Sequence, residues 1–81
     1  MKELVQFLAK NLVNNPDAVN VVETQGETAS VLELRVAKED LGRIIGKQGR
    51  TAKSIRTILN AVASRTNRKV VLEIVEDRQP A

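Results

Sequence analysis

The sequence has no cysteine and no histidine, and its only aromatic residue is Phe7. Without thiolates or imidazoles, the usual zinc ligands, cysteine nucleophiles, serine-histidine triads and the common general base near neutral pH are all excluded. A catalytic site would have to rest on Lys, Asp or Glu alone. We therefore predict a protein that is not an enzyme and that holds neither a metal nor a cofactor, with Phe7 in its core.

The sequence also lacks a long hydrophobic run. No stretch approaches the roughly 18 apolar residues that a membrane-spanning helix needs, and the first residues form a helix pattern interrupted by Lys10 rather than an apolar signal segment. We expect a soluble, cytoplasmic protein with no membrane contact. A chain of 81 residues, 42% hydrophobic and 28% charged, has the composition of one small domain with one core. We assign that domain to residues 1–76 and a flexible tail to residues 77–81, where Pro80 disfavours regular structure.

Acidic residues are missing from a long internal segment. Residues 41–72 contain none, whereas all ten acids of the chain lie outside this segment. The same segment contains eight basic residues: Arg43, Lys47, Arg50, Lys53, Arg56, Arg65, Arg68 and Lys69. Although the net charge is only +3, this division predicts one surface that faces a polyanion.

Apolar periodicity predicts an α+β domain with the order helix, strand, strand, helix, helix, strand. We expect helices at residues 2–14, 38–45 and 50–65, and strands at 19–25, 30–36 and 70–75. In the second strand Leu32, Leu34 and Val36 alternate with more polar residues, which indicates one buried face. The last strand is apolar at almost every position, which predicts a strand that is buried between neighbouring strands or covered on both faces. Three helices would then cover one face of a three-stranded sheet.

A loop with two glycines, Gly46-Lys47-Gln48-Gly49, separates the last two predicted helices. Glycine at both ends lets another backbone approach closely, and the amides that open the following helix are suited to bind an anion. Two better-known phosphate loops do not fit. A Walker A loop would need glycine at Leu41 and a hydroxyl at Gln48, and a dinucleotide-binding fingerprint would need glycine at Ile44, after a strand.

The segment from Ile44 to Ile55 resembles the signature of KH domains, in which an aliphatic pair precedes a GxxG loop and aliphatic residues follow at helical spacing. The order of elements resembles the bacterial type II KH fold over residues 1–76. The short chain and the stretch from Gly42 to Arg50 are similar to the small bacterial KhpA (YlqC-type) family. This resemblance implies a cytoplasmic RNA-binding protein, an RNA chaperone or post-transcriptional regulator, that forms homodimers and pairs with a larger KhpB (Jag or EloR type) protein.

The resemblance also implies where RNA would bind. KH modules hold about four nucleotides on the GxxG loop and read unpaired bases in a groove between helix and strand. We expect the groove to be lined by Leu41, Ile45, Ala52 and either Leu34 or Val36. Ala52 stands where KH signatures usually have a large aliphatic residue, which predicts a shallower groove or one lined by Ile55. The RNA-binding residues implied are Arg43, Ile45, Gly46, Lys47, Gln48, Gly49, Arg50 and Lys53.

Alternative interpretations stay open at this point. The two glycines could form only a tight turn between helices, and the basic residues could form only a solvated helix face. We expect Arg56, Arg65, Arg68 and Lys69 to be surface residues outside the site. Ile44 and Ile55 are predicted to be core, whereas Leu41 and Ile45 fit either the core or the groove. A second function, from a different class, is a protein-interaction module in which the KH fold mainly mediates dimerisation.

Overall fold

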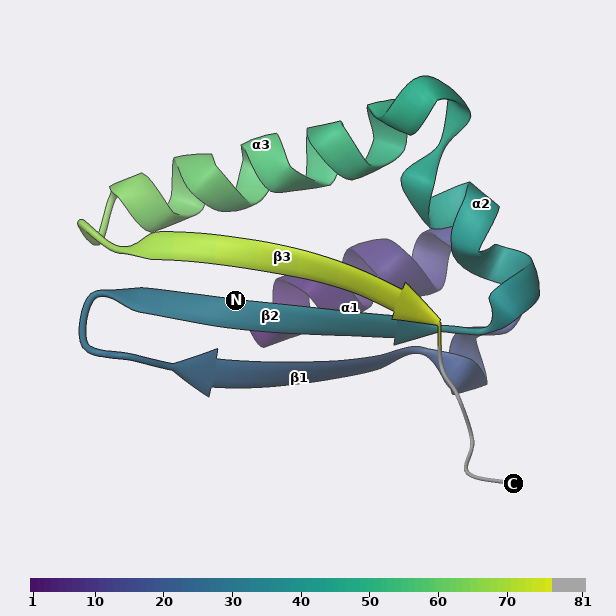
Figure 1. Ribbon diagram of the computed structural model, residues 1–81, viewed down its shortest axis with the longest axis horizontal. Helices are drawn as coiled ribbons and strands as arrows, with labels where there is room; N and C mark the ends of the chain where they lie inside the picture. Colours follow the sequence, from purple (N-terminus) through teal and green to yellow (C-terminus); the bar gives the residue numbers. More distant parts are fainter. Residues whose placement is uncertain (77–81) are drawn as a thin grey trace.

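The computed structural model describes residues 1–76, so the flexible tail predicted at 77–81 lies outside the described residues. The principal elements are α1 (Lys2–Leu12), β1 (Asn20–Gln25), β2 (Ala29–Val36), α2 (Leu41–Ile45), α3 (Arg50–Ser64) and β3 (Lys69–Glu76). They have the predicted order (Figure 1). None of the helices within residues 1–76 has the length and apolarity to cross a membrane.

The three strands form one mixed sheet in the order β1-β2-β3. β1 and β2 pair antiparallel across a turn at Gly26, whereas β2 and β3 pair parallel, with Leu32 opposite Leu72. A parallel pair needs a crossover connection, and here α2 and α3 provide it. In Figure 1, α3 runs alongside β3, α1 lies behind the sheet, and α2 lies at the end where β2 and β3 terminate. α2 and the start of α3 are thereby held at this end of the sheet.

All three helices bury apolar side chains against the same face of the sheet, as predicted. β2 has the alternating burial expected from its sequence, with Leu32, Leu34 and Val36 fully buried. Opposite them, the helices contribute these buried side chains: Val5 and Ala9 from α1, Ile44 from α2, and Ile55 and Leu59 from α3. The positions predicted for Ile44 and Ile55 are confirmed. The other face of the sheet is not covered by any element within residues 1–76.

The ends of the elements differ modestly from those predicted. α1 ends at Leu12 rather than Asn14, because Val13 is already extended. Pro16 then begins a short 3-10 helix, Pro16–Ala18. The helix predicted at 38–45 consists of a 3-10 turn, Lys38–Asp40, followed by α2. Beyond the far end of α3, Asn67 has a left-handed conformation, with φ 59°.

Two predictions about burial were wrong. Phe7 is not in the core, because 65% of its surface is exposed. It lies two residues from the buried Val5, which places it about 200° around the helix on the opposite face. β3 is not buried on both faces either. It is an edge strand, in which only Leu72 is buried and Val71 is 40% exposed. Its apolar residues 70, 72 and 74 face the core, and Val71 and Val75 face the open side of the sheet.

Candidate nucleic-acid interface

The connection from α2 to α3 is a tight turn with three residues at positive φ. Gly46 has φ 78° and ψ 171°, Gln48 has φ 58°, and Gly49 has φ 75°. Lys47–Gly49 forms a single 3-10 turn. The sequence predicts the bend at the two glycines. It does not predict the left-handed Gln48, since glutamine adopts this conformation only rarely.

The two glycines are required for different reasons. A Cβ on Gly46 would lie 2.6 Å from Cβ of Thr51 and 2.8 Å from its backbone nitrogen, so no side chain fits there. A Cβ on Gly49 would meet nothing within 4 Å. The side of Gly49 where a side chain would project is therefore open space. No side chain of residues 1–76 fills it, so another backbone can approach the turn there.

Backbone hydrogen bonds within the turn fix its shape. The N–H of Gly49 donates to the carbonyl of Gly46 over 3.1 Å, and the N–H of Arg50 donates to the carbonyl of Lys47. The amides that open α3 were expected to suit an anion, but the first of them, that of Arg50, is used inside the protein. No side chain caps the start of α3, because its N-cap residue is Gly49.

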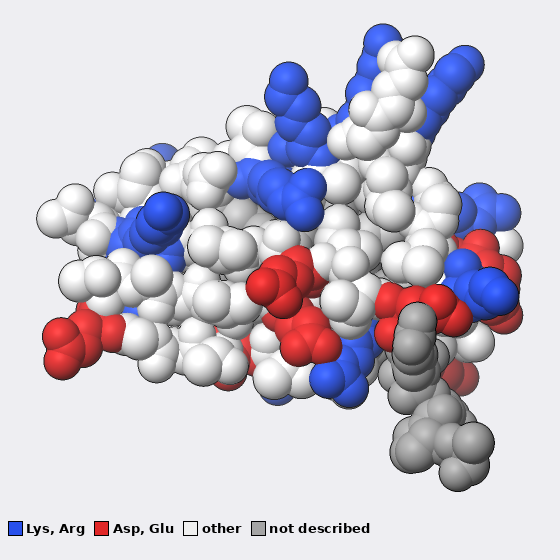
Figure 2. All heavy atoms as spheres, viewed as in Figure 1, with Lys and Arg blue, Asp and Glu red and all other residues white. Residues whose placement is uncertain are grey.

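The polar side chains of the turn project into solvent. Lys47, Gln48, Arg50 and Lys53 are all exposed. Within residues 1–76, no carboxylate lies within 4.0 Å of any of the three cations. Figure 2 shows lysine and arginine side chains extending outward where α2 meets α3. Because Lys47, Arg50 and Lys53 have no acidic partner in the described part of the chain, their charges are available to an anionic ligand.

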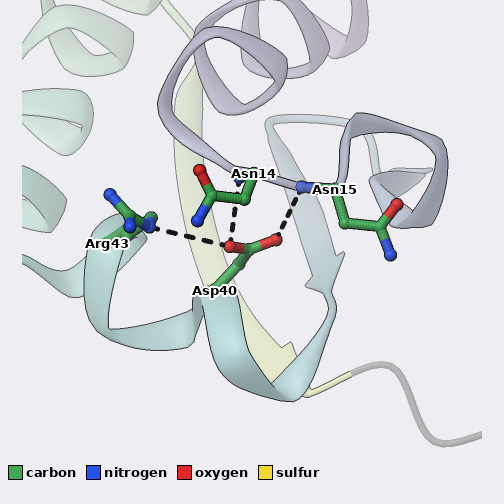
Figure 3. A network of polar contacts seen from close by, with 4 residues as sticks. All are labelled: Asn14, Asn15, Asp40 and Arg43. Carbon is green, nitrogen blue, oxygen red and sulfur yellow. Dashed lines mark hydrogen bonds and ion pairs between the residues drawn. The ribbon is translucent and has the colours of Figure 1, made fainter.

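Arg43 has a different environment, because it belongs to a polar network around Asp40 (Figure 3). Asp40 is only 1% exposed, and its two oxygens accept hydrogen bonds from the backbone N–H groups of Asn14 and Asn15, each over 3.1 Å. Nε of Arg43 lies 3.8 Å from Oδ1 of Asp40. Turning the Asn14 amide places its oxygen 3.0 Å from Nη2 of Arg43, so we assign that orientation. The side chain of Arg43 is nevertheless 54% exposed.

Asp40 lies in the 3-10 turn that leads into α2. Its real contacts join the segment after α1 to the start of α2. No sequence pattern indicates them, because its partners are backbone groups 25 and 26 residues away. By anchoring α2, Asp40 fixes the element from which the glycine turn extends.

The predicted lining of a groove is correct only in part. Leu34 and Val36 are fully buried and Ala52 is 4% exposed, so none of the three can form an open wall. Ile45 is 42% exposed and Leu41 partly buried, which places Ile45 at the surface beside the turn. The strand that borders α3 is β3, not β2. A hollow of about 180 Å³ lies between them, lined by Arg56, Leu59, Asn60, Val70, Val71 and Leu72.

Two of the basic residues predicted to lie outside the site form structural contacts. The guanidinium of Arg68 donates to the carbonyls of Gly26 and Glu27, over 3.0 and 3.3 Å, and to Oγ of Ser30. It thereby holds the turn between β1 and β2, at the end of the sheet away from the glycine turn. Nη2 of Arg56 donates to the carbonyl of Leu72 over 3.2 Å. Sequence analysis missed this contact with the edge strand.

Comparison with known proteins agrees with this geometry. Residues 2–74 match the family model described as the KH domain of KhpA/KhpB. The chain is similar to proteins named RNA-binding protein KhpA from Clostridium perfringens, Chlamydia trachomatis and Aquifex aeolicus. The Clostridium protein is 55% identical over 93% of this chain and 100% of its own length. The Chlamydia protein is 55% identical over 96% and 100%, and the Aquifex protein 50% identical over 94% and 96%. The KH resemblance predicted from residues 44–55 is thus confirmed, and this chain belongs to the KhpA/KhpB family of KH domains.

Proposed function

We propose that this protein is a non-catalytic RNA-binding protein that holds the backbone of single-stranded RNA on the turn from Gly46 to Gly49. Residues 1–76 act as one KH domain, and the protein works in the cytoplasm as an RNA chaperone or post-transcriptional regulator. The observation that carries the proposal is the open space over Gly49, beside three cations that have no acidic partner within residues 1–76. The printed names of the relatives, RNA-binding protein KhpA, support the same ligand.

Each residue has a role that follows from its position. Lys47, Arg50 and Lys53 neutralise phosphates, since they are exposed and not paired with acids within residues 1–76. Gln48 offers a side-chain amide at the tip of the turn. Gly46 and Gly49 supply the conformation and the close approach. Arg43 and Ile45 lie on α2 beside the turn, where a guanidinium held by Asp40 and an exposed aliphatic side chain contact the same strand of RNA.

The experiment that tests this proposal replaces Lys47 and Gln48 together by aspartate. Two carboxylates would then stand where phosphates are expected, while both glycines remain. Asp is among the residues that best tolerate the left-handed conformation found at Gln48. Binding to an unstructured eight-nucleotide RNA, measured by fluorescence anisotropy, should weaken at least about 30-fold, the loss of two or more phosphate contacts. The circular dichroism spectrum should not change.

The matched control replaces Arg65 and Asn67 by aspartate. This pair has the same charges, and Asn67 has φ 59°, close to that of Gln48. It lies beyond the other end of α3, about 22 Å from the turn along the helix axis. The control should bind RNA within about threefold of the wild type. Equal losses of RNA affinity in both variants would mean that binding depends only on the net charge of the protein, and the turn would be rejected as the site.

A second candidate function is a protein-interaction module that forms homodimers, or heterodimers with a KhpB-type protein. The observation in its favour is a set of exposed apolar side chains on the helices: Phe7, Leu12, Ile58 and Val62, each between 38% and 65% exposed. Exposed apolar residues of this size are typical of interaction surfaces when they are adjacent. Dimerisation and RNA binding are compatible, since two weak sites on one dimer would bind a suitable RNA more tightly by avidity.

Sedimentation of the same aspartate variants distinguishes the two functions. If the turn binds RNA, the variant at Lys47 and Gln48 should keep the oligomeric state of the wild type but lose RNA binding. If that variant instead loses dimerisation and keeps RNA binding, the assembly function is favoured.

A further inference from the structure

The guanidinium of Arg43 is held along one edge by the side chain of Asn14, in the segment that follows α1. In the orientation assigned above, the amide oxygen of Asn14 accepts from Nη2 of Arg43 over 3.0 Å and from Nε over 3.2 Å. Figure 3 shows the two side chains facing each other. Nε and Nη2 form one edge of the planar group, so one oxygen engages two of its five N–H donors. The other three donors, on Nη1 and Nη2, remain for a ligand.

Asp40 fixes this arrangement without using those three donors. Its two oxygens already accept the backbone N–H groups of Asn14 and Asn15, each over 3.1 Å. Nε of Arg43 lies 3.8 Å from Oδ1 of Asp40, which is longer than a hydrogen bond. Asp40 therefore ties the residues after α1 to the start of α2, and in this way sets the distance between Asn14 and Arg43. The direct hydrogen bonds to the guanidinium come from a neutral amide.

The free edge of the guanidinium is available beside the glycine turn. Arg43 precedes Gly46 by three residues, about 4.5 Å along the axis of α2, and its side chain is 54% exposed. The edge formed by Nη1 and Nη2 matches two oxygens of one phosphate, which it can bind through two parallel hydrogen bonds. A side chain that is already held loses less conformational freedom when a ligand binds. The contact with Asn14 thus prepares Arg43 for a phosphate.

We propose that Asn14 is a positioning residue, which holds Arg43 so that its free edge binds one RNA phosphate next to the glycine turn. Asn14 itself does not contact the RNA. This inference rests on the proposed RNA binding. It adds a role for the end of α1, a segment that supplies none of the RNA-binding residues named above, and it gives Arg43 a defined contact with the backbone of the RNA.

A double-mutant cycle tests the proposal, with affinity for the unstructured eight-nucleotide RNA measured by fluorescence anisotropy. Arg43→Ala should weaken binding about fivefold, the loss of one charge-assisted contact. It should also make the dependence of log affinity on log salt shallower by about 0.7, the share of one phosphate on a single strand. Asn14→Ala should weaken binding about threefold when Arg43 is present. In the Arg43→Ala background it should change affinity by less than about 1.5-fold, because the group that it positions is gone.

Asn15→Ala is the matched control. Asn15 is the next residue, and its backbone N–H also donates to Asp40, but its side chain points away from Arg43 in Figure 3. Both alanine variants keep their backbone N–H, so they differ in whether a side chain that holds Arg43 has been removed. Asn15→Ala should bind RNA within about 1.5-fold of the wild type. Thermal unfolding of every variant separates a loss of affinity from a loss of fold.

Three results would overturn the inference. Asn14→Ala could bind as tightly as the wild type, it could weaken binding equally with and without Arg43, or Asn15→Ala could weaken binding as much as Asn14→Ala. The first would show that Arg43 needs no positioning, and the other two that the effect does not pass through Arg43. If the wild type binds RNA and loses it on the aspartate changes at Lys47 and Gln48, these results reject only the role of Asn14. If the wild type does not bind RNA, the proposed function fails as well.

Discussion

Gly46 and Gly49 have nearly the same φ, but their surroundings differ. At Gly46 the pair φ 78° and ψ 171° belongs to a region that is essentially restricted to glycine, and Thr51 fills the space beside it. At Gly49, φ 75° and ψ 11° are left-handed, and the adjacent space is empty. The first glycine is therefore needed for the turn to fold. The second mainly leaves room for another molecule to approach the backbone of the turn.

Alanine substitutions should separate these two roles. Gly49→Ala should lower the free energy of unfolding by about 1–2 kcal/mol, the cost of a left-handed conformation for a residue with a Cβ. Gly46→Ala should cost more than about 3 kcal/mol, because a clash with Thr51 adds to a less favourable conformation. Urea denaturation measures both values. Equal costs at the two positions would contradict this account of the turn.

At the scale of elements, the position of the turn depends on how α2 is attached. α2 has only five residues, so it has little helical stability of its own. Two contacts hold it: the burial of Ile44 in the core, and the hydrogen bonds from Asn14 and Asn15 to Asp40 at its start. The end of α1 and the start of α2 are joined in this way. The glycine turn extends from a fixed point.

Asp40→Asn should therefore destabilise the protein. Each side-chain oxygen of Asp40 accepts a hydrogen bond from one backbone N–H. An asparagine has an NH₂ group in place of one of these oxygens, so one backbone N–H would face a second donor. Leaving a buried donor unsatisfied, and removing the charge beside Arg43, should lower the free energy of unfolding by about 2–3 kcal/mol. Asp17→Asn, at an exposed position, is the control and should change it by less than about 0.5 kcal/mol. A similar small effect at Asp40 would show that the network does not anchor α2.

Sequence patterns predicted the elements well, because each helix and the central strand bury residues at a regular period. β2 and α3 have the burial that their periodicity indicates. Phe7 was predicted to be buried because it is aromatic. Its position on α1, on the face opposite the buried Val5, should have counted for more. The error at β3 had another cause. An apolar strand does not reveal whether it lies at the centre or the edge of a sheet, because this depends on pairing between distant segments.

The candidate site was predictable to a similar extent. The turn and its exposed cations could be predicted from local sequence, because a glycine changes the backbone at its own position and a charged side chain stays in solvent. The contacts of Asp40 and Arg56 join segments 16 to 26 residues apart, and no local pattern encodes them. The groove was predicted with the wrong strand for the same reason: which strand borders α3 is a property of the whole fold.

At the scale of the molecule, acidic and basic side chains lie on different parts of the surface. The uncovered face of the sheet carries Glu33 and Glu73, which are neighbours in the register of β2 and β3. Arg35 neutralises Glu33 through a contact of 2.7 Å. In Figure 2, red side chains gather on this face and blue ones along the border formed by α3 and the turn. On the proposed function, the unpaired cations of that border would attract RNA more strongly than the uncovered face of the sheet would.

This division predicts a measurable dependence on salt. If about four phosphates are contacted, the logarithm of the binding constant should fall with the logarithm of salt concentration, with a slope of roughly −2 to −3 for single-stranded RNA. Anisotropy titrations over a range of potassium chloride concentrations give the slope. A value shallower than about −1 would mean that the exposed cations do not contact the backbone.

The most direct measurement is an NMR titration of the protein with an unstructured eight-nucleotide RNA, following every backbone amide. The account predicts that the largest shifts occur from Gly46 to Lys53, and that smaller ones occur at Val70 to Leu72 beside the hollow. Amides of α1 and of the uncovered sheet face should move little. Shifts concentrated on α1 or on that face, with the amides of the turn unchanged, would contradict the claim that RNA lies on the glycine turn.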